Sequence, residues 1–132
     1  MGASISILVV DDNPDMTTAL ADVLEVKGFA VHAAASGAEA LEILREYPVD
    51  ILLTDVKMAG MNGLELHRQA RKLYPRLITI FMTAYAVDEL IQQGMAEGVK
   101  IVLDKPVDIN FMVSLFSAEK RLINESSRKD SG

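Results

Sequence analysis

Three consecutive apolar residues, Ile51, Leu52 and Leu53, constrain the fold more than any other feature of this 132-residue sequence. The run does not alternate apolar with polar residues, which is typical of a strand buried on both faces of a parallel sheet. Asp55 follows two residues later, so a carboxylate stands at the carboxyl edge of the predicted strand. Ligands of open α/β sheets bind at this edge. Asp55 is therefore the first candidate for the chemistry of the protein.

The rest of the chain alternates predicted strands and helices. Clusters of β-branched and apolar residues predict strands at 5–10, 29–34, 50–55, 77–83 and 99–103. Helices are predicted in the intervals and after the last strand, where capping residues precede helical apolar spacing: Asn13 with Pro14, Ser36 with Glu39, and Asp108. Five such repeats predict an α/β fold of three layers, with a parallel five-stranded sheet between two layers of helices.

Two segments of the pattern are weak. Residues 86–95 have a helical composition but a poor apolar stripe, so we expect a short and loosely held helix there. The segment 124–132 has no apolar residue and is expected to be a polar tail or linker. Residues 4–123 are then one domain, which is an ordinary size for a single hydrophobic core.

Composition excludes several classes of protein. The chain has no Cys, which rules out disulfides and thiolate metal sites. Its net charge of −6 argues against direct binding of nucleic acid by this segment. No apolar run approaches the ~20 residues of a membrane span, and the N-terminus lacks the pattern of a signal peptide. We therefore expect a cytoplasmic protein with no membrane contact.

Further polar residues are predicted at the same sheet edge as Asp55. Asp11 and Asp12 follow the first strand, Thr83 ends the fourth, and Lys105 follows the fifth. Three neighbouring carboxylates repel one another, and their hard oxygen ligands favour Mg²⁺. A carboxylate can also accept a phosphoryl group, helped by a nearby ammonium and hydroxyl that bind phosphoryl oxygens. The pattern thus predicts an aspartyl-phosphate site that works by positioning and charge neutralisation.

These motifs resemble the receiver domain of two-component response regulators, the family of the chemotaxis response regulator. The resemblance covers about residues 4–122. It rests on the paired acids Asp11-Asp12, on Asp55, on Thr83-Ala84 and on Lys105-Pro106. It implies the flavodoxin-like (βα)5 fold with strand order 2-1-3-4-5.

The resemblance also implies roles for the acidic residues. Asp55 would be the phosphoacceptor. Mg²⁺ would be bound by the side chains of Asp12 and Asp55 and by the backbone carbonyl of Lys57, with Asp11 acting mostly through water.

For the remaining motifs, the family implies that Thr83 and Lys105 bind phosphoryl oxygens and that the bond before Pro106 is cis. The phosphoryl donor would be a histidine kinase or a phosphotransfer protein. The protein would be a regulator rather than an enzyme, assisting only its own phosphorylation and dephosphorylation. Its fourth helix, fifth strand and fifth helix would form the face that changes, and this face would control an output partner, an effector domain beyond the C-terminus, or a homodimer.

Three positions depart from the family pattern. Ala59 stands where the loop often has Pro, which relaxes the loop without removing chemistry. Val102 stands at the usual aromatic switch position, so the usual inward rotation of a ring is not available. We also expect Tyr85 and Lys57 to flank the phosphoryl group, restrict attack by water and prolong the phosphorylated state.

Three other functions compete with the receiver interpretation. A haloacid-dehalogenase-like phosphatase would need an Asp-x-Asp pattern after the first strand, which Asp11-Asp12-Asn13 lacks. A flavin or nucleotide binder should have a first loop rich in Gly, Ser or Thr, and this loop is acidic. An interaction domain independent of phosphorylation would not need the complete acid set. His32 and His67 are predicted to lie at the surface or on a helix flank, with no assigned role.

Overall fold

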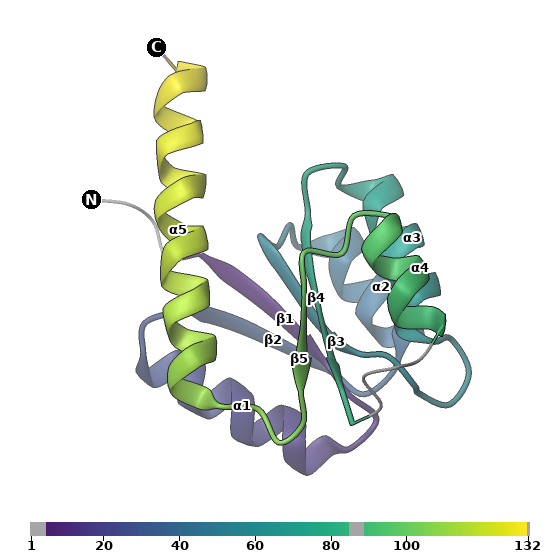
Figure 1. Ribbon diagram of the computed structural model, residues 1–132. Helices are drawn as coiled ribbons and strands as arrows, with labels where there is room; N and C mark the ends of the chain where they lie inside the picture. Colours follow the sequence, from purple (N-terminus) through teal and green to yellow (C-terminus); the bar gives the residue numbers. More distant parts are fainter. Residues whose placement is uncertain (1–4, 85–88, 132) are drawn as a thin grey trace.

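Five parallel strands form the centre of the molecule, and helices cover both faces of the sheet (Figure 1). The computed structural model describes residues 5–84 and 89–131, with side chains up to residue 124. The strands are β1 (Ser6–Val10), β2 (Ala30–Ala34), β3 (Ile51–Asp55), β4 (Ile78–Thr83) and β5 (Ile101–Asp104). The helices are α1 (Pro14–Val26), α2 (Gly37–Glu46), α3 (Gly63–Leu73), α4 (Glu89–Ala96) and α5 (Ile109–Ser131). The strand order is 2-1-3-4-5, which confirms the predicted fold.

The apolar run of β3 is buried because its residues pack on both faces of the sheet. Ile51 and Leu53 belong to the core that α1 and α5 cover, whereas Leu52 belongs to the core under α2 and α3. All three side chains are fully buried. β3 also lies in the middle of the sheet, between β1 and β4, so the residue at its carboxyl end sits centrally at the edge.

The predicted capping residues begin three of the helices. Asn13 Oδ1 accepts hydrogen bonds from the backbone N–H groups of Asp15 and Met16, and Ser36 Oγ accepts one from Glu39. Asp108 Oδ1 accepts one from the N–H of Phe111. These local bonds fix where α1, α2 and α5 begin, and therefore where the loops at the carboxyl edge lie.

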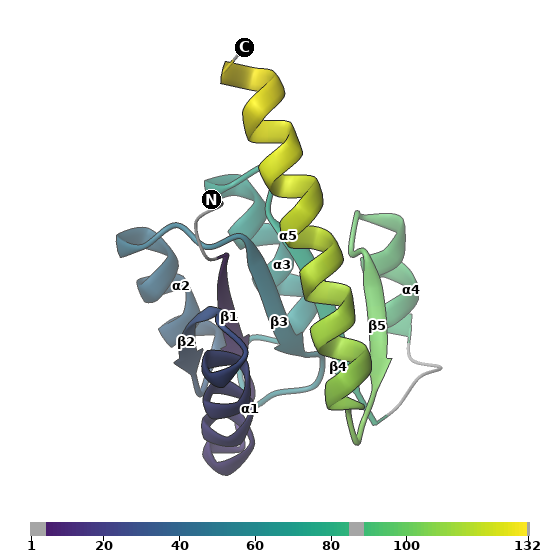
Figure 2. The same ribbon diagram turned by 90° about the vertical axis from the view of Figure 1, so that its left-hand side faces the viewer.

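The described part of α4 agrees with the prediction, whereas α5 is longer than predicted. The structure describes α4 only from Glu89, and the predicted start at 86 falls outside the described residues, as does Tyr85. The segment from 124, predicted as a tail or linker, instead continues α5 as far as Ser131. No Gly or Pro interrupts the sequence from Ile109 to Ser131, so nothing in the backbone chemistry ends the helix earlier. Figures 1 and 2 show this helix projecting well past the sheet.

The prediction for His67 was wrong. The side chain is 1% exposed and lies between α3 and β4, where both ring nitrogens are hydrogen-bonded. His32, in contrast, is half-buried on the edge strand β2, with its ring stacked on Tyr47 at a centroid distance of 5.1 Å. Among the helices of the described chain, none combines the length and the apolar character needed to cross a membrane.

Candidate functional site

Three carboxylates meet at the carboxyl edge of the sheet. Asp11 and Asp12 come directly after β1, and Asp55 is the last residue of the neighbouring strand β3. One carboxylate oxygen from each of the three lies within 4.8 Å of the others. Asp11 is 1% exposed and Asp12 is exposed, so the group extends from the interior to the solvent. The strand ends therefore bring together the acids that the sequence predicted would meet.

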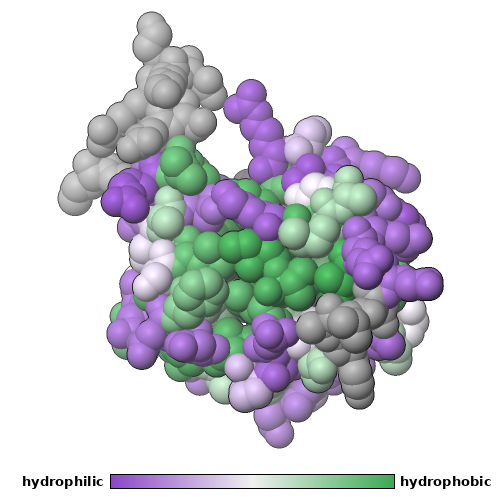
Figure 3. All heavy atoms as spheres, in the orientation of Figure 1, coloured by the Kyte–Doolittle hydropathy of each residue, from purple (hydrophilic) through white to green (hydrophobic). Residues whose placement is uncertain are grey.

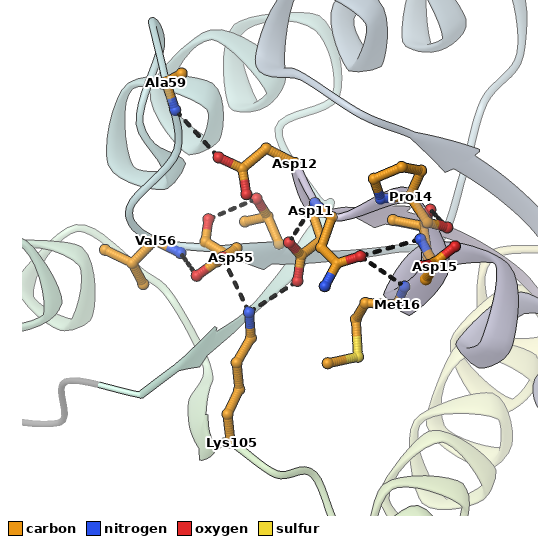
Figure 4. Close-up of polar contacts among 12 residues, drawn as sticks. Asp11, Asp12, Pro14, Asp15, Met16, Asp55, Val56, Ala59 and Lys105 are labelled. Carbon is orange, nitrogen blue, oxygen red and sulfur yellow. Dashed lines mark hydrogen bonds and ion pairs between the residues drawn. The ribbon is translucent and has the colours of Figure 1, made fainter.

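Lys105 joins two of these acids. Its Nζ donates hydrogen bonds to Asp11 Oδ2 at 2.8 Å and to Asp55 Oδ2 at 3.0 Å. Figure 4 shows the side chain reaching up between the two carboxylates. The backbone N–H of Lys105 donates to the carbonyl of Thr83 at 2.9 Å, and the peptide bond to Pro106 is cis. The loop after β5 is thus connected to the end of β4 as well as to the acids.

Backbone N–H groups hold each carboxylate in place. Asn13 donates to Asp11 Oδ1 at 2.9 Å, and Val56 donates to Asp55 Oδ1 at 2.8 Å. Asp12 Oδ2 receives a longer bond, 3.4 Å, from the N–H of Ala59 (Figure 4). The oxygens of Asp55 are therefore distinct, since Oδ1 is bound by backbone and Oδ2 by the ammonium of Lys105.

Burial and the neighbouring charges shift the pKa values of Asp55 and Lys105. Burial raises the pKa of the Asp55 carboxyl and the charge of Asp11 adds to this, although the hydrogen bond from Lys105 opposes both. For Lys105, burial works to lower the pKa, but the hydrogen bonds to Asp11 and Asp55 outweigh it and the pKa is raised. The ammonium therefore stays charged and offsets part of the repulsion between the acids.

The other predicted site residues lie around this group. Thr83 is 1% exposed at the end of β4, opposite Asp104 in the pairing of β4 with β5. Lys57 is exposed in the loop after β3. Val102 is half-buried on β5 and packs with a cluster on the α4 face that includes Phe81. Tyr85 falls outside the described residues, so its predicted position beside Lys57 stays a prediction.

Gly63 was missed by the sequence reasoning although it constrains the site. A Cβ atom at this position would lie 2.5 Å from the backbone carbonyl oxygen of Asp55. The N–H of Gly63 donates to the carbonyl of Val56 at 2.8 Å, which closes the loop between β3 and α3. The Asn62-Gly63 pair at the start of the helix was the available signal, because Asn62 caps α3 and leaves Gly in the first turn.

Comparison with known proteins gives a consistent result. Residues 7–117 match the family model described as response regulator receiver domain. The response regulator receiver protein CpdR of Brucella abortus is 38% identical over 117 residues, which cover 89% of this chain and 96% of that protein. The transcriptional regulatory protein ZraR of Escherichia coli K12 is 37% identical over 107 residues, but these cover only 24% of that protein. The chain thus spans nearly the whole length of CpdR but about a quarter of the length of ZraR.

A solved structure shows the same fold. The response regulator receiver domain protein (CheY-like) of Methanospirillum hungatei superposes with a TM-score of 0.87 at 27% identity, covering 93% of this chain and 98% of that one. The family model covers most of the sequence, and it includes every described residue of the acidic group. The protein therefore belongs to the response regulator receiver domain family.

Proposed function

We propose that Asp55 accepts a phosphoryl group from a phosphohistidine of a partner kinase or phosphotransfer protein. The observation that supports this most is the meeting of Asp11, Asp12, Asp55 and Lys105, which come from three separate parts of the chain. Like charges seldom gather at a partly buried site unless a function needs them. Receiver domains act as signalling regulators, and an acid group with an adjacent ammonium suits that role better than catalytic turnover.

The acidic group fits Mg²⁺. It offers carboxylate oxygens within 4.8 Å of one another, and exposed Asp12 leaves room for the water ligands that Mg²⁺ retains. We propose Asp12, Asp55 and the backbone carbonyl of Lys57 as ligands, with Asp11 acting mostly through water. When bound, the ion would supply positive charge that offsets the acids and attracts phosphoryl oxygens.

Asp55 would act as the nucleophile. A carboxylate oxygen forms a bond to phosphorus while the bond from phosphorus to the donor imidazole nitrogen breaks, and the imidazole leaves with the electron pair. The N–H of Val56 holds Oδ1 and thereby orients the carboxylate. Lys105 already lies 3.0 Å from Oδ2 and would move onto a phosphoryl oxygen. Thr83, at the adjoining strand end, would donate its hydroxyl to another.

The output would come from the face formed by α4, β5 and α5. Phosphorylation adds about −1.5 to −2 charge, which draws Thr83 and Lys105 toward Asp55 and shifts the ends of β4 and β5. Figure 3 shows apolar side chains gathered over β5 between α4 and α5, where Ile101 and Val102 are half-buried. We propose this face as the contact for an effector or a second copy. With Val102 in place of an aromatic ring, repacking of α4 rather than rotation of a ring would carry the change.

The lifetime of the phosphorylated state would depend on Lys57 and Tyr85. Lys57 is exposed two residues after Asp55. Its long cationic side chain would restrict the in-line approach of water. Lys57→Asn and Tyr85→Ala should each speed the loss of phosphoryl, and equal or slower loss in both variants would contradict the idea.

Transfer to Asp55 can be tested directly. The purified protein, incubated with Mg²⁺ and acetyl phosphate, should gain one phosphoryl group that hydroxylamine removes, as expected of an acyl phosphate. Asp55→Asn should abolish the labelling. Asp104→Asn is the matched control, because Asp104 is also at the carboxyl edge but is exposed and outside the acidic group. Retained labelling in Asp55→Asn would reject the assignment, and labelling unaffected by a chelator would reject the metal.

A further inference from the structure

Side chains of α3 bind the turn that follows α4. The guanidinium of Arg68 forms two hydrogen bonds with the carboxylate of Glu97, at 2.7 and 2.6 Å. Arg71 donates to the carbonyl of Gly98 at 3.1 Å and to that of Leu77 at 2.7 Å. Glu97 and Gly98 come directly after the last residue of α4 and lead into β5. The end of α4 is therefore attached to α3 by more than packing.

His67 forms the buried part of this attachment. Its ring lies between α3 and β4, with Nδ1 2.7 Å from Thr79 Oγ1 and Nε2 3.0 Å from the carbonyl oxygen of Glu97. His67 is 1% exposed and Thr79 is fully buried. One imidazole thus connects three elements: α3, which carries it, β4 through Thr79, and the end of α4 through Glu97.

The partners determine the tautomer. A carbonyl oxygen only accepts hydrogen bonds, so Nε2 carries the proton and donates to Glu97. In the neutral ring Nδ1 then has a lone pair, and the hydroxyl of Thr79 must donate to it. A second proton on Nδ1 would make the ring a donor at both nitrogens, and the hydroxyl of Thr79 would have to rotate and accept instead of donating. The cost of protonation therefore lies in placing a cation at a position that is 1% exposed and next to two arginines.

The charged groups around the ring do not favour an imidazolium. From α3, Arg68 and Arg71 contribute positive charge next to it, and Lys72 and Glu65 lie at the mouth of the same surface pocket. From the end of α4, the carbonyl and the carboxylate of Glu97 both favour a cation, and the carboxylate is already paired with Arg68. From β4, the facing group is the neutral hydroxyl of Thr79.

We propose that His67 is a positioning residue whose protonation releases the end of α4 from α3 and β4. The imidazolium would be a buried cation next to Arg68 and Arg71, so it would move from between α3 and β4 toward the pocket. On leaving it would give up its bonds with Thr79 and with the carbonyl of Glu97. The turn at Glu97 and Gly98 would then be held only by the arginines. The release of the turn after α4 does not depend on the proposed function. Its consequence for the face formed by α4, β5 and α5 does rest on the proposed function.

The charge state of His67 at pH 7 supports the proposed role of its protonation. Burial lowers the pKa of His67, the two arginines act in the same direction, and the bond to Glu97 opposes them. The ring is thus neutral at pH 7 with the link formed. Acidification below the ordinary histidine value of about 6.5 would break the link.

NMR titration of the full chain without a phosphoryl donor tests the release. The chain has two histidines, so half-buried His32 provides an internal comparison. The imidazole of His67 should be the Nε2–H tautomer at pH 7 and should titrate with a midpoint below the ordinary histidine value of about 6.5. The backbone amides of Glu97, Gly98 and Val99 should shift with the midpoint of His67. An ordinary midpoint for His67, or amides that follow His32 instead, would overturn the proposal.

His67→Gln provides the matched variant, because a glutamine amide can donate to Glu97 and accept from Thr79 but does not titrate. Its Glu97 and Gly98 amides should be insensitive to pH, and the same pH response as wild type would contradict the proposal. Thr79→Val tests the surroundings of the ring without removing the histidine. Valine accepts no hydrogen bond from the imidazolium, and a bond from a charged donor is stronger than one to the neutral ring, so the midpoint of His67 should fall further. A raised midpoint would contradict the proposal.

A final measurement separates this proposal from the proposed function. With acetyl phosphate and Mg²⁺ present, the shifts of the α4 amides should depend on pH in wild type and not in His67→Gln. If neither protein responds to acetyl phosphate, the proposed function fails while the titration still decides the role of His67. If both respond identically at each pH, the coupling to α4 fails.

Discussion

Lys105 and Asp11 are 94 residues apart in the chain, yet Lys105 Nζ donates a hydrogen bond to Asp11 Oδ2 at 2.8 Å. The same ammonium contacts Asp55, so one cation balances two carboxylates that would otherwise face each other. Asp11 is 1% exposed and has little solvent to screen its charge. In the metal-free protein, Lys105 therefore acts as an internal counter-ion.

Lys105→Met should destabilise the metal-free protein. Removing the ammonium leaves Asp11 and Asp55 without a cation, and we expect a loss of roughly 1–3 kcal/mol in the free energy of unfolding. Millimolar Mg²⁺ should restore most of this loss, because the metal supplies the missing charge. Urea unfolding with and without Mg²⁺ measures both effects. Lys72→Met, at an exposed position of α3, is the control and should change little; equal losses in the two variants would contradict the counter-ion role.

Asp55→Asn should raise stability at neutral pH when Mg²⁺ is absent. Because burial raises the pKa of Asp55, the folded state binds a proton there more readily than the unfolded chain does. The wild type then loses stability as the pH rises from about 4 through the raised pKa, and Asn removes this loss. The advantage of the variant should therefore be largest at neutral pH and should shrink toward pH 4. Thermal unfolding of both proteins across this pH range measures the difference in stability. A stability advantage of Asp55→Asn that grows as the pH falls would contradict the prediction.

Gly63→Ala should damage the site through the backbone. The added Cβ would lie 2.5 Å from the carbonyl oxygen of Asp55 and 3.0 Å from Val56 Cα, and neither backbone atom can move without shifting β3. We expect a loss of about 1–3 kcal/mol, typical of overpacking, together with slower phosphorylation. Both are measurable, by urea unfolding and by the labelling assay.

Gly37→Ala is the matched control for this variant. Gly37 is also buried and also begins a helix, but its Cβ would meet the Cβ and the Sδ of Met61, each at 2.9 Å. The sulfur can move by a change of rotamer and the Cβ by a shift of the loop before α3, so the expected loss is smaller than that of Gly63→Ala. The prediction fails if the two alanine variants lose similar stability.

Lys100→Met should cost more than Glu119→Gln. The ammonium of Lys100 pairs with the carboxylate of Glu119, whose side chain is 5% exposed on α5, so the methionine variant leaves a buried carboxylate without a cation. Lys100 itself is 42% exposed, so we expect about 1–2 kcal/mol rather than the loss of a fully buried pair. Glu119→Gln removes the charge that needs a partner and should cost less. Urea unfolding of both variants gives the order, and the reverse order would exclude this explanation.

Much of the fold was predictable because the signals were local. Apolar runs gave the strands, and Asn13, Ser36 and Asp108 gave helix starts that the structure reproduces. The site followed from topology, since parallel strands deliver Asp11 and Asp55 to one edge whatever their separation in sequence. That argument needs only the order of strands, not the details of packing.

The rest depended on contacts between distant residues. His67 was predicted at the surface because a single polar residue on a helix usually lies there, and its partners are 12 and 30 residues away. The close approach of Gly63 to Asp55 likewise depends on how α3 packs against the end of β3. The end of α5 could not be predicted from apolar spacing because the last residues have none to read.

The length of α5 has a mechanical consequence. Its 23 residues make a rod of about 35 Å, and the far end of this rod projects past the sheet (Figures 1 and 2). Such a helix is a lever arm with its fulcrum at the loop after β5, next to Lys105. A tilt of roughly 10° at that loop would carry the far end of the helix through about 6 Å.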